Sequence, residues 1–126
     1  MTPGLLDTGR LLRRIDATDA SVDPLDFWSV LSNHRRRRVI RLLEELDTPV
    51  DLRALADAVA TDDISPVEDT DRARQSIYVS LYQHHVPTLD AAGAIRWDED
   101  AGTVRDGPAM EAYRIALDVA DKVIVE

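Results

Sequence analysis

The sequence predicts a single domain of the mainly helical α+β class, with several short helices, a small β-hairpin and one further helix. Three observations support this. A chain of 126 residues with 44% apolar residues can bury one core but not two. Apolar residues recur at i, i+3, i+4 and i+7 through most of residues 24–92, which indicates helices. Residues 95–105 instead alternate between apolar and charged side chains, which indicates strands.

The first helices each begin at a recognisable N-terminal residue. "PLDFWSVLS" starts with Pro24, a residue suited to a first helical turn. Asn33 is expected to cap the second helix, and Asp51 the third, after a short extended break at "TPV", residues 48–50. The apolar stripe of the second helix consists of Val39, Leu42, Leu43 and Leu46.

The second half of the chain begins with a polar connector, residues 61–71, before a long helix, residues 72–92. Pro87 is expected to kink this helix, because proline removes a helical hydrogen bond. A hairpin over residues 95–105 and a last helix over residues 108–125 follow. The predicted buried stripe of the long helix is Ile77, Tyr78, Leu81, Tyr82, His85 or Val86, and Leu89.

The expected organisation is a flexible N-terminal arm (residues 1–22), a domain (residues 23–107) and a C-terminal dimerisation helix (residues 108–126). The order helix, helix, short strand, helix, helix, hairpin is the order of a winged helix-turn-helix. The sequence therefore predicts a winged helix-turn-helix with an extra C-terminal helix.

Several motifs strengthen this prediction. "FWSVLSNHRRRRVIRLL", "VDLRALADAVA" and "LDAAGAIRWDEDAGTV" resemble the pattern of ArsR-like winged-helix proteins. "RQSIYVSLYQHHVPTLDAAG" is similar to a haloarchaeal family of uncharacterised winged-helix domains, typified by Y-x-S-L-Y-Q-x-H-x-P-x-L. The resemblance covers about residues 25–106 and implies the fold, whereas the haloarchaeal family supplies no activity.

The charged residues are unusual in kind. Of 24 acidic residues 18 are aspartates, and of 15 basic residues only Lys122 is a lysine, with a net charge of -9. Such a composition is typical of proteins from salt-loving archaea, although a GC-rich genome and chance acidity would also produce it. In molar salt the Debye length falls to about 3 Å, so the negative net charge does not exclude DNA as a partner.

The arginine run from residue 35 to residue 38 carries the densest positive charge. Steps of 100° place Arg35 on the buried face of its helix, Arg36 at the boundary of that face and Arg38 on the flank. Arg37 and Arg41 lie on the far side, where they are predicted to contact phosphates. Cations in a first turn oppose the helix dipole, so each needs a partner. The alternative is that every arginine pairs with aspartates of the chain or of a second copy.

The long helix is the predicted recognition helix, with residues 72–86 in the major groove of double-stranded DNA. With its apolar stripe turned inward, small and polar residues point outward, where Gln83 can read an adenine and Arg72 a guanine or phosphate. Arg96 and Arg105, near the base of the hairpin, are further predicted phosphate contacts. A solvated polar face is the alternative interpretation. The outward line is Arg72, Ser76, Val79, Ser80 and Gln83.

Carboxylates stand where such domains usually face phosphates. The connector and the hairpin tip, Asp98 to Asp100, would repel a duplex in low salt. The same residues can mark a surface that faces a protein. A winged-helix interaction module without DNA binding is therefore the alternative function.

The last helix carries apolar residues at the a and d spacing of a helix–helix seam. ArsR-like proteins commonly dimerise through terminal helices, so the resemblance implies a homodimer; packing onto the chain's own first helix is the alternative. The predicted function is a homodimeric DNA-binding transcriptional regulator that recognises a palindromic site. The predicted seam is Met110, Tyr113, Leu117, Ala120 and Ile124.

We expect no enzymatic activity, cofactor or metal. The chain has no cysteine, no glycine-rich phosphate loop and no Ser-His-Asp order. His84 and His85 are adjacent and point about 100° apart on a helix, so they cannot share a metal. His85 is expected to lie in the core and His34 to be exposed. Asp69 to Asp71 are expected to cap the long helix. With no signal peptide or membrane span visible, a cytoplasmic location is expected.

Overall fold

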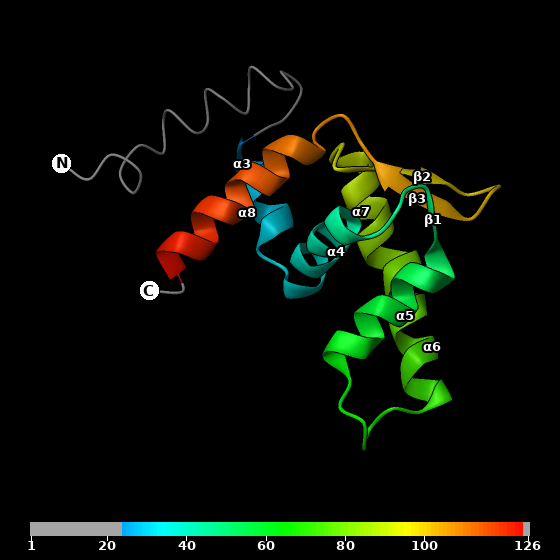
Figure 1. Cartoon of the computed structure of the whole chain (residues 1–126). Helices are drawn as coiled ribbons and strands as arrows, with labels where there is room; N and C mark the ends of the chain where they lie inside the picture. The colour runs from blue at the N-terminus through cyan, green and yellow to red at the C-terminus, as the bar shows by residue number, and fades with distance from the viewer. Residues whose placement is uncertain (1–23, 125–126) are drawn as a thin grey trace.

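The computed structural model describes residues 24–124, and these form a mainly helical α+β fold with a small antiparallel sheet (Figure 1). The predicted arm, residues 1–22, lies outside the described residues, as do residues 125 and 126. None of the described helices is both long and apolar enough to cross a membrane. The elements are α3 (Pro24–Leu31), α4 (His34–Glu45), β1 (Val50–Asp51), α5 (Leu52–Asp63), α6 (Asp71–Ser80), η1 (Leu81–His85), α7 (Val86–Ala91), β2 (Ile95–Asp98), β3 (Thr103–Asp106) and α8 (Met110–Ile124).

The predicted caps of α4 and α5 are confirmed. The Asn33 side-chain oxygen accepts hydrogen bonds from the backbone N–H groups of Arg35 (2.9 Å) and Arg36 (3.1 Å). The Asp51 carboxylate accepts one from the backbone N–H of Arg53 at 2.7 Å. Each cap satisfies donors that the first helical turn leaves without a partner inside the helix.

The connector between α5 and α6 is shorter than predicted, because α5 continues to Asp63 before the chain turns. Of the predicted capping residues, Thr70 is the one that caps α6: its hydroxyl oxygen accepts from the backbone N–H of Ala73 at 3.0 Å. The neighbouring Asp69 pairs with Arg74 at 2.7 Å instead, which ties the connector to the first turns of α6.

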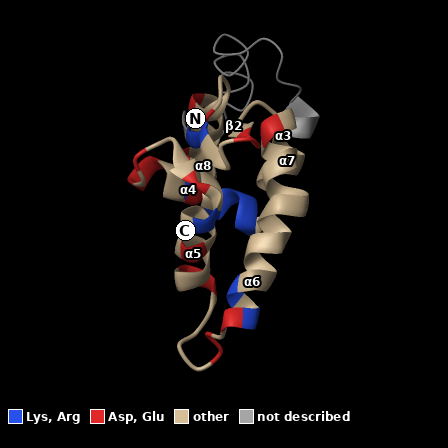
Figure 2. Ribbon diagram, turned by 90° about the vertical axis from the view of Figure 1, so that its right-hand side faces the viewer, with Lys and Arg blue, Asp and Glu red and all other residues tan. Residues whose placement is uncertain are grey.

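The helix predicted over residues 72–92 consists of α6, the π-helical turn η1 and α7, which Figure 2 shows as one continuous column. Pro87 has no N–H to donate to the carbonyl of Gln83. The backbone widens before the proline, where the N–H of Val86 reaches the carbonyl of Leu81, five residues back. Downstream, the Thr88 hydroxyl donates to the carbonyl of His84 at 2.7 Å.

The π-helical turn changes which side chains are buried. His85 and Val86 both face the core, with 8% and 0% of their surfaces exposed. Tyr82, by contrast, is 42% exposed, so its predicted place in the buried stripe is wrong. A regular 100° step cannot describe a turn that contains an extra residue.

The predicted hairpin is confirmed, and β1 extends it into a sheet of order β1-β3-β2. In the register, Trp97 lies opposite Val104 and Val50 lies on the other side of Val104. Val104 is fully buried, so this face of the sheet covers the core. Gly102 closes the turn with φ of +70°, a conformation that glycine adopts without strain.

α8 packs into the same core as the other helices rather than standing apart from it. The rings of Phe27 in α3 and Tyr113 in α8 stack with centroids 4.5 Å apart. Met110, Tyr113 and Leu117 are each at most 2% exposed. These three predicted dimer residues therefore belong to the interior of one chain, and their assignment to an interface is corrected.

Candidate nucleic-acid interface

The predicted outward face of the long helix is largely exposed. Arg72, Ser76, Val79 and Gln83 are all exposed, Val79 by 37%. Residues 75–83 carry no formal charge, and in Figure 2 the charged residues at the start of α6 colour the N-terminal end of the column, before this stretch. Ser80 is only half-buried, and its hydroxyl oxygen accepts from Arg35 Nη1 at 3.4 Å. Ser80 is thus turned partly toward α4.

An aromatic row that the sequence analysis did not anticipate runs along the flank of this face. The Arg53 guanidinium carbon lies 3.9 Å from the centroid of the Tyr78 ring. Tyr78 and Tyr82 follow with centroids 6.4 Å apart, and Tyr82 meets Trp97 of β2 edge to face at 6.2 Å. The row connects α5, α6, η1 and the hairpin through contacts in which aromatic rings and cations attract each other.

The Tyr82 hydroxyl ends this row at the tip of the hairpin. It donates a hydrogen bond to Glu99 Oε1 at 3.1 Å. This bond and the negative charge of Glu99 raise the pKa of the Tyr82 hydroxyl, because both favour the protonated phenol. The two side chains are exposed, yet they join η1 to the β2–β3 turn directly.

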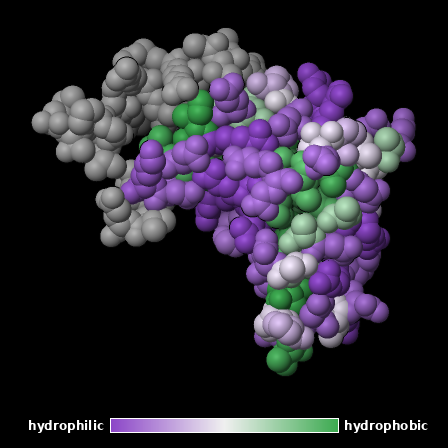
Figure 3. All heavy atoms as spheres, viewed as in Figure 1, coloured by the Kyte–Doolittle hydropathy of each residue, from purple (hydrophilic) through white to green (hydrophobic). Residues whose placement is uncertain are grey.

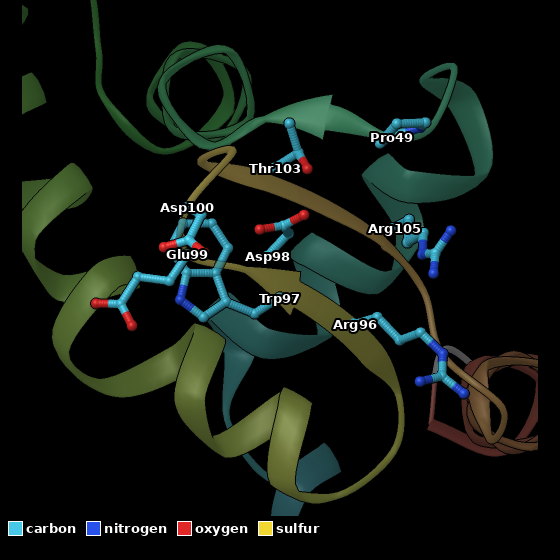
Figure 4. A pocket seen from close by; sticks show the side chains of 8 residues that line it. All are labelled: Pro49, Arg96, Trp97, Asp98, Glu99, Asp100, Thr103 and Arg105. Carbon is cyan, nitrogen blue, oxygen red and sulfur yellow. The ribbon is translucent and has the colours of Figure 1, made fainter.

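The outer face of the hairpin places two arginines side by side. Arg96 and Arg105 occupy opposite positions in the antiparallel register, and both are exposed. They line an open groove with Pro49 and Thr103, whose other end is formed by the acidic turn (Figure 4). Like charges directly opposite one another destabilise a sheet, so an anion bound here would relieve that repulsion.

The arginine run at the start of α4 is engaged within the chain. Arg36 Nε donates to the Val30 carbonyl at 2.9 Å, and Arg37 Nη1 donates to the Leu31 carbonyl at 2.7 Å. These carbonyls end α3, where helix carbonyls have no partner inside the helix and the helix dipole is negative. The cations that oppose the dipole of α4 therefore stabilise the C-terminus of α3.

The remaining arginines of α4 pair with carboxylates. Arg35 Nε lies 3.4 Å from Asp63, and Arg38 lies 2.9 Å from Asp62, both in the last turn of α5. The predicted burial of Arg35 is confirmed in part, because its side chain is 30% exposed. The predicted partners are thus present: carboxylates for these two arginines and backbone carbonyls for Arg36 and Arg37.

Arg41 reaches α8 instead of solvent. Its guanidinium lies 2.9 Å from Asp118 and 2.7 Å from Asp121, and it also contacts Glu44 at 3.3 Å. Arg114 joins the same network through Glu44 at 3.4 Å. Both arginines predicted to bind phosphate from α4, Arg37 and Arg41, thus already have partners inside the fold.

Three arginines differ from all the others that the structure describes. The described chain contains eleven arginines, and eight of them hydrogen-bond or pair with another group. Among residues 24–124, Arg72, Arg96 and Arg105 make no hydrogen bond or ion pair. All three had been predicted as nucleic-acid contacts, one on the long helix and two on the hairpin.

The histidines form no metal site. His34 is exposed, as predicted, and lies 3.8 Å from Asp63. His85 is buried, also as predicted, and its Nδ1 has no hydrogen-bond partner. Desolvation, with smaller contributions from the charges of Arg36, Arg35 and His84, lowers its pKa to about 4. Within the part of the chain that the structure describes, no three His, Cys, Asp or Glu residues are grouped as metal ligands.

Comparison with known proteins places this domain in a family. Neither the curated proteins nor the solved structures contain a match to the chain. A family model described as a domain of unknown function (DUF7344) matches residues 28–105, which extend from α3 through the long helix to the hairpin. The chain therefore belongs to the DUF7344 family.

Proposed function

We propose that this protein is a DNA-binding transcriptional regulator with a winged helix-turn-helix fold. α5 and the α6–η1–α7 helix form the helix-turn-helix, and the β2–β3 hairpin is the wing. α6 and η1 enter the major groove, and the wing lies along the flanking backbone. The order of helices and strands supports this assignment, as does the exposed polar face of α6.

The observation that carries the proposal is that Arg72, Arg96 and Arg105 have no hydrogen-bond or ion-pair partner among residues 24–124. A chain with 24 acidic residues offers carboxylates in excess, and the other described arginines use them, use backbone carbonyls or, for Arg53, use the side-chain oxygen of Gln75. Arginines that remain without partners on the long helix and the wing are available to phosphate oxygens. Their positions, far apart in sequence, coincide with the two elements that face DNA in winged-helix domains.

Base recognition is assigned to the uncharged part of the face. Gln83 can bond bidentately to an adenine edge, and Ser76 can bond to a base or to a phosphate. Val79 supplies an apolar contact for a thymine methyl group. Ser80 contributes less than predicted from sequence, because its hydroxyl already accepts a bond from Arg35.

We propose that the protein works in the cytoplasm of a halophilic archaeon, where molar salt screens the acidic wing tip. At about 1 M salt the Debye length is roughly 3 Å, so repulsion from Asp98 and Asp100 reaches little beyond contact. The same salt removes most of the gain from counterion release. Short-range base contacts, rather than net charge, then determine affinity.

The proposed regulator remains a homodimer, but through a different part of α8. Met110, Tyr113 and Leu117 are buried in the chain, whereas Ile115, Val119 and Ala120 are only half-buried. Ala120 also borders an apolar hollow with Trp28 and Leu31 of α3. Ile124, the fifth predicted seam residue, lies at the end of α8. Pairing of this α3–α8 surface would set two recognition helices about one DNA turn apart.

Selection of ligands from random duplexes tests the proposal in about 2–3 M KCl, because salt determines the outcome. We expect an enriched palindromic motif. Gln83→Ala should weaken binding to it by roughly 5- to 200-fold and relax preference at one base pair. His84→Ala is the matched control, since His84 is exposed and adjacent to Gln83 but is not part of the predicted outward line. No enriched motif for the wild-type protein would refute DNA recognition.

A protein-binding module is the second candidate function. On the face in Figure 3, hydrophobic residues form small separate patches within a hydrophilic surface. Two of the exposed large hydrophobic residues, Val79 and Tyr82, lie on the long helix, and Tyr82 adjoins the acidic wing tip. A partner with basic and apolar side chains would match that corner. Substitution of Ser80 and Gln83 that removes such a partner without changing DNA occupancy in cells favours this module.

A further inference from the structure

The wing tip of this protein is attached to the recognition helix by a side-chain contact. Glu99 lies in the β2–β3 turn and Tyr82 in η1, and 3.1 Å separates their oxygens. Tyr82 lies in the π-helical turn, 42% of its surface is exposed, and its hydroxyl reaches the wing tip. The same turn therefore carries the contact between the recognition helix and the wing.

The contact is one end of a longer support. The Tyr82 ring meets Trp97, which stands on β2 beside Arg96, and on its other side it stacks on Tyr78. Arg53 of α5 covers Tyr78 in turn. Isolated two-stranded hairpins are marginally stable in water, and β1 contributes only two residues to this sheet. The aromatic row and the Tyr82–Glu99 bond therefore restrain a hairpin that its own ladder holds weakly.

We propose that Tyr82 and Glu99 are positioning residues that fix the angle between wing and recognition helix, so that Arg96 and Arg105 reach the phosphates flanking the bases read by Gln83. This inference rests on the proposed DNA-binding function. It assigns to Glu99 a role opposite to that expected of a carboxylate near DNA. The charge repels phosphate weakly, while the hydrogen bond orders the arginines that bind it.

The neighbouring carboxylates provide the contrast that makes this testable. Asp98 accepts a bond from the Ala101 N–H at 3.0 Å and shapes the turn. Asp100 is exposed and, among the described residues, makes no hydrogen bond or ion pair. Glu99 and Asp100 thus carry the same charge one residue apart, and only Glu99 is attached to the helix. Asp100 is the matched control.

The first experiment needs no DNA. Amide hydrogen exchange of residues 95–106 is compared in the full chain for wild type, Tyr82→Phe, Glu99→Ala and Asp100→Ala. Tyr82→Phe removes only the hydroxyl, so the core is undisturbed. We expect both Tyr82→Phe and Glu99→Ala to speed exchange in the wing by about three- to tenfold, as loss of one exposed hydrogen bond of ordinary strength implies. Unchanged exchange in both would overturn the positioning role.

The second experiment measures affinity for the selected duplex. Asp100→Ala and Glu99→Gln remove a charge without breaking a structural bond, so both should strengthen binding, and more so as KCl is lowered. Glu99→Ala removes the same charge and the bond, and should bind about tenfold more weakly than Asp100→Ala. Equal gains for Glu99→Ala and Asp100→Ala would show repulsion alone. If no duplex binds, the proposed function fails, while the exchange experiment still decides whether the contact restrains the wing.

Discussion

Two groups of arginines in this protein behave in opposite ways: the consecutive arginines of α4, and the single arginines of α6 and the β2–β3 hairpin. At the start of α4, consecutive arginines contact α3 and α5 and are engaged by carbonyls and carboxylates. On α6 and the β2–β3 hairpin, single arginines far apart in sequence have no partner among the described residues. Density of charge along a sequence is therefore a poor guide to a binding surface, because a helix distributes neighbours around its axis.

Position in the fold explains the difference. α4 is central: its arginines border the C-terminal ends of α3 and α5 and the carboxylates of α8, where negative groups are concentrated. Arg72 lies in the first turn of α6, and Arg96 and Arg105 lie on the outer face of the sheet, so each is exposed to solvent. The engaged arginines hold helices together, and the free ones are available to a ligand. The following predictions test that division, beginning with the largest effect.

Leu117→Ala tests whether α8 packs into the core of its own chain, beside the arginines of α4. Leu117 is 2% exposed, and truncation of a buried leucine costs about 3 kcal/mol. We expect urea denaturation to show that loss at every protein concentration. Ile115→Ala, at a half-buried position of the same helix, should cost about 1 kcal/mol. A small loss for Leu117→Ala together with a shift from dimer to monomer would show instead that Leu117 lies in a dimer interface.

The pH dependence of stability tests the burial of His85 beside the arginines of α4. Its pKa falls from 6.5 to about 4 on folding, so the unfolded chain binds more protons between those values. Native stability is therefore complete above about pH 6.5 and is lost as the pH falls toward 4. Between pH 7.5 and 5 the loss from His85 is about 2 kcal/mol. His85→Gln should remove this part of the pH dependence in urea titrations, whereas His84→Gln should not.

An unchanged pH dependence in His85→Gln would mean that other groups carry the transition. It would also mean that burial, with the smaller contributions of Arg36 and Arg35, does not hold the imidazole of His85 neutral. The helices around His85 would then be less tightly packed than the structure shows.

Local signals made much of this fold predictable. Asn33, Asp51 and the hairpin turn act within a few residues of chain, so their patterns are visible in the sequence. The π-helical turn was missed because proline allows either a kink or a widened turn, and the choice depends on what packs around His85 and Val86. The contact of Tyr82 with Glu99 joins residues seventeen positions apart, so the local pattern did not reveal it.

Partners distant in sequence were harder to predict. Steps of 100° along the helix placed Arg41 on the side of α4 that faces solvent. The carboxylates that it contacts on α8 lie far along the chain, so the sequence of α4 alone could not reveal them. The seam of α8 has the same a and d spacing whether it packs on α3 and α4 or on a second copy. Sequence periodicity therefore predicted that Met110 and Leu117 would be buried, and could not choose what covers them.

Arg41→Ala separates a structural arginine from a DNA contact. Its removal leaves Glu44, Asp118 and Asp121 close together without their shared cation. We expect a loss of about 1 kcal/mol in unfolding free energy, growing as KCl is lowered, since networks of partly exposed charges are worth more than isolated pairs. Affinity for the selected duplex should stay unchanged. Normal stability together with weakened DNA binding would show instead that Arg41 contacts DNA.

Alanine substitution of Arg72, Arg96 or Arg105 should have the smallest effect on stability. Without partners to lose, each variant should unfold within about 0.5 kcal/mol of wild type. Each should nevertheless lower the slope of log affinity against log salt by about 0.9, because one phosphate contact is removed. Arg105→Lys keeps a cation and should retain the slope.

Because Arg96 and Arg105 repel each other across the strands, removing one should slightly stabilise the free protein while weakening its complex with DNA. A variant that loses stability and keeps its salt slope would belong with the arginines of α4, and the division between engaged and free arginines would have to be redrawn at that residue.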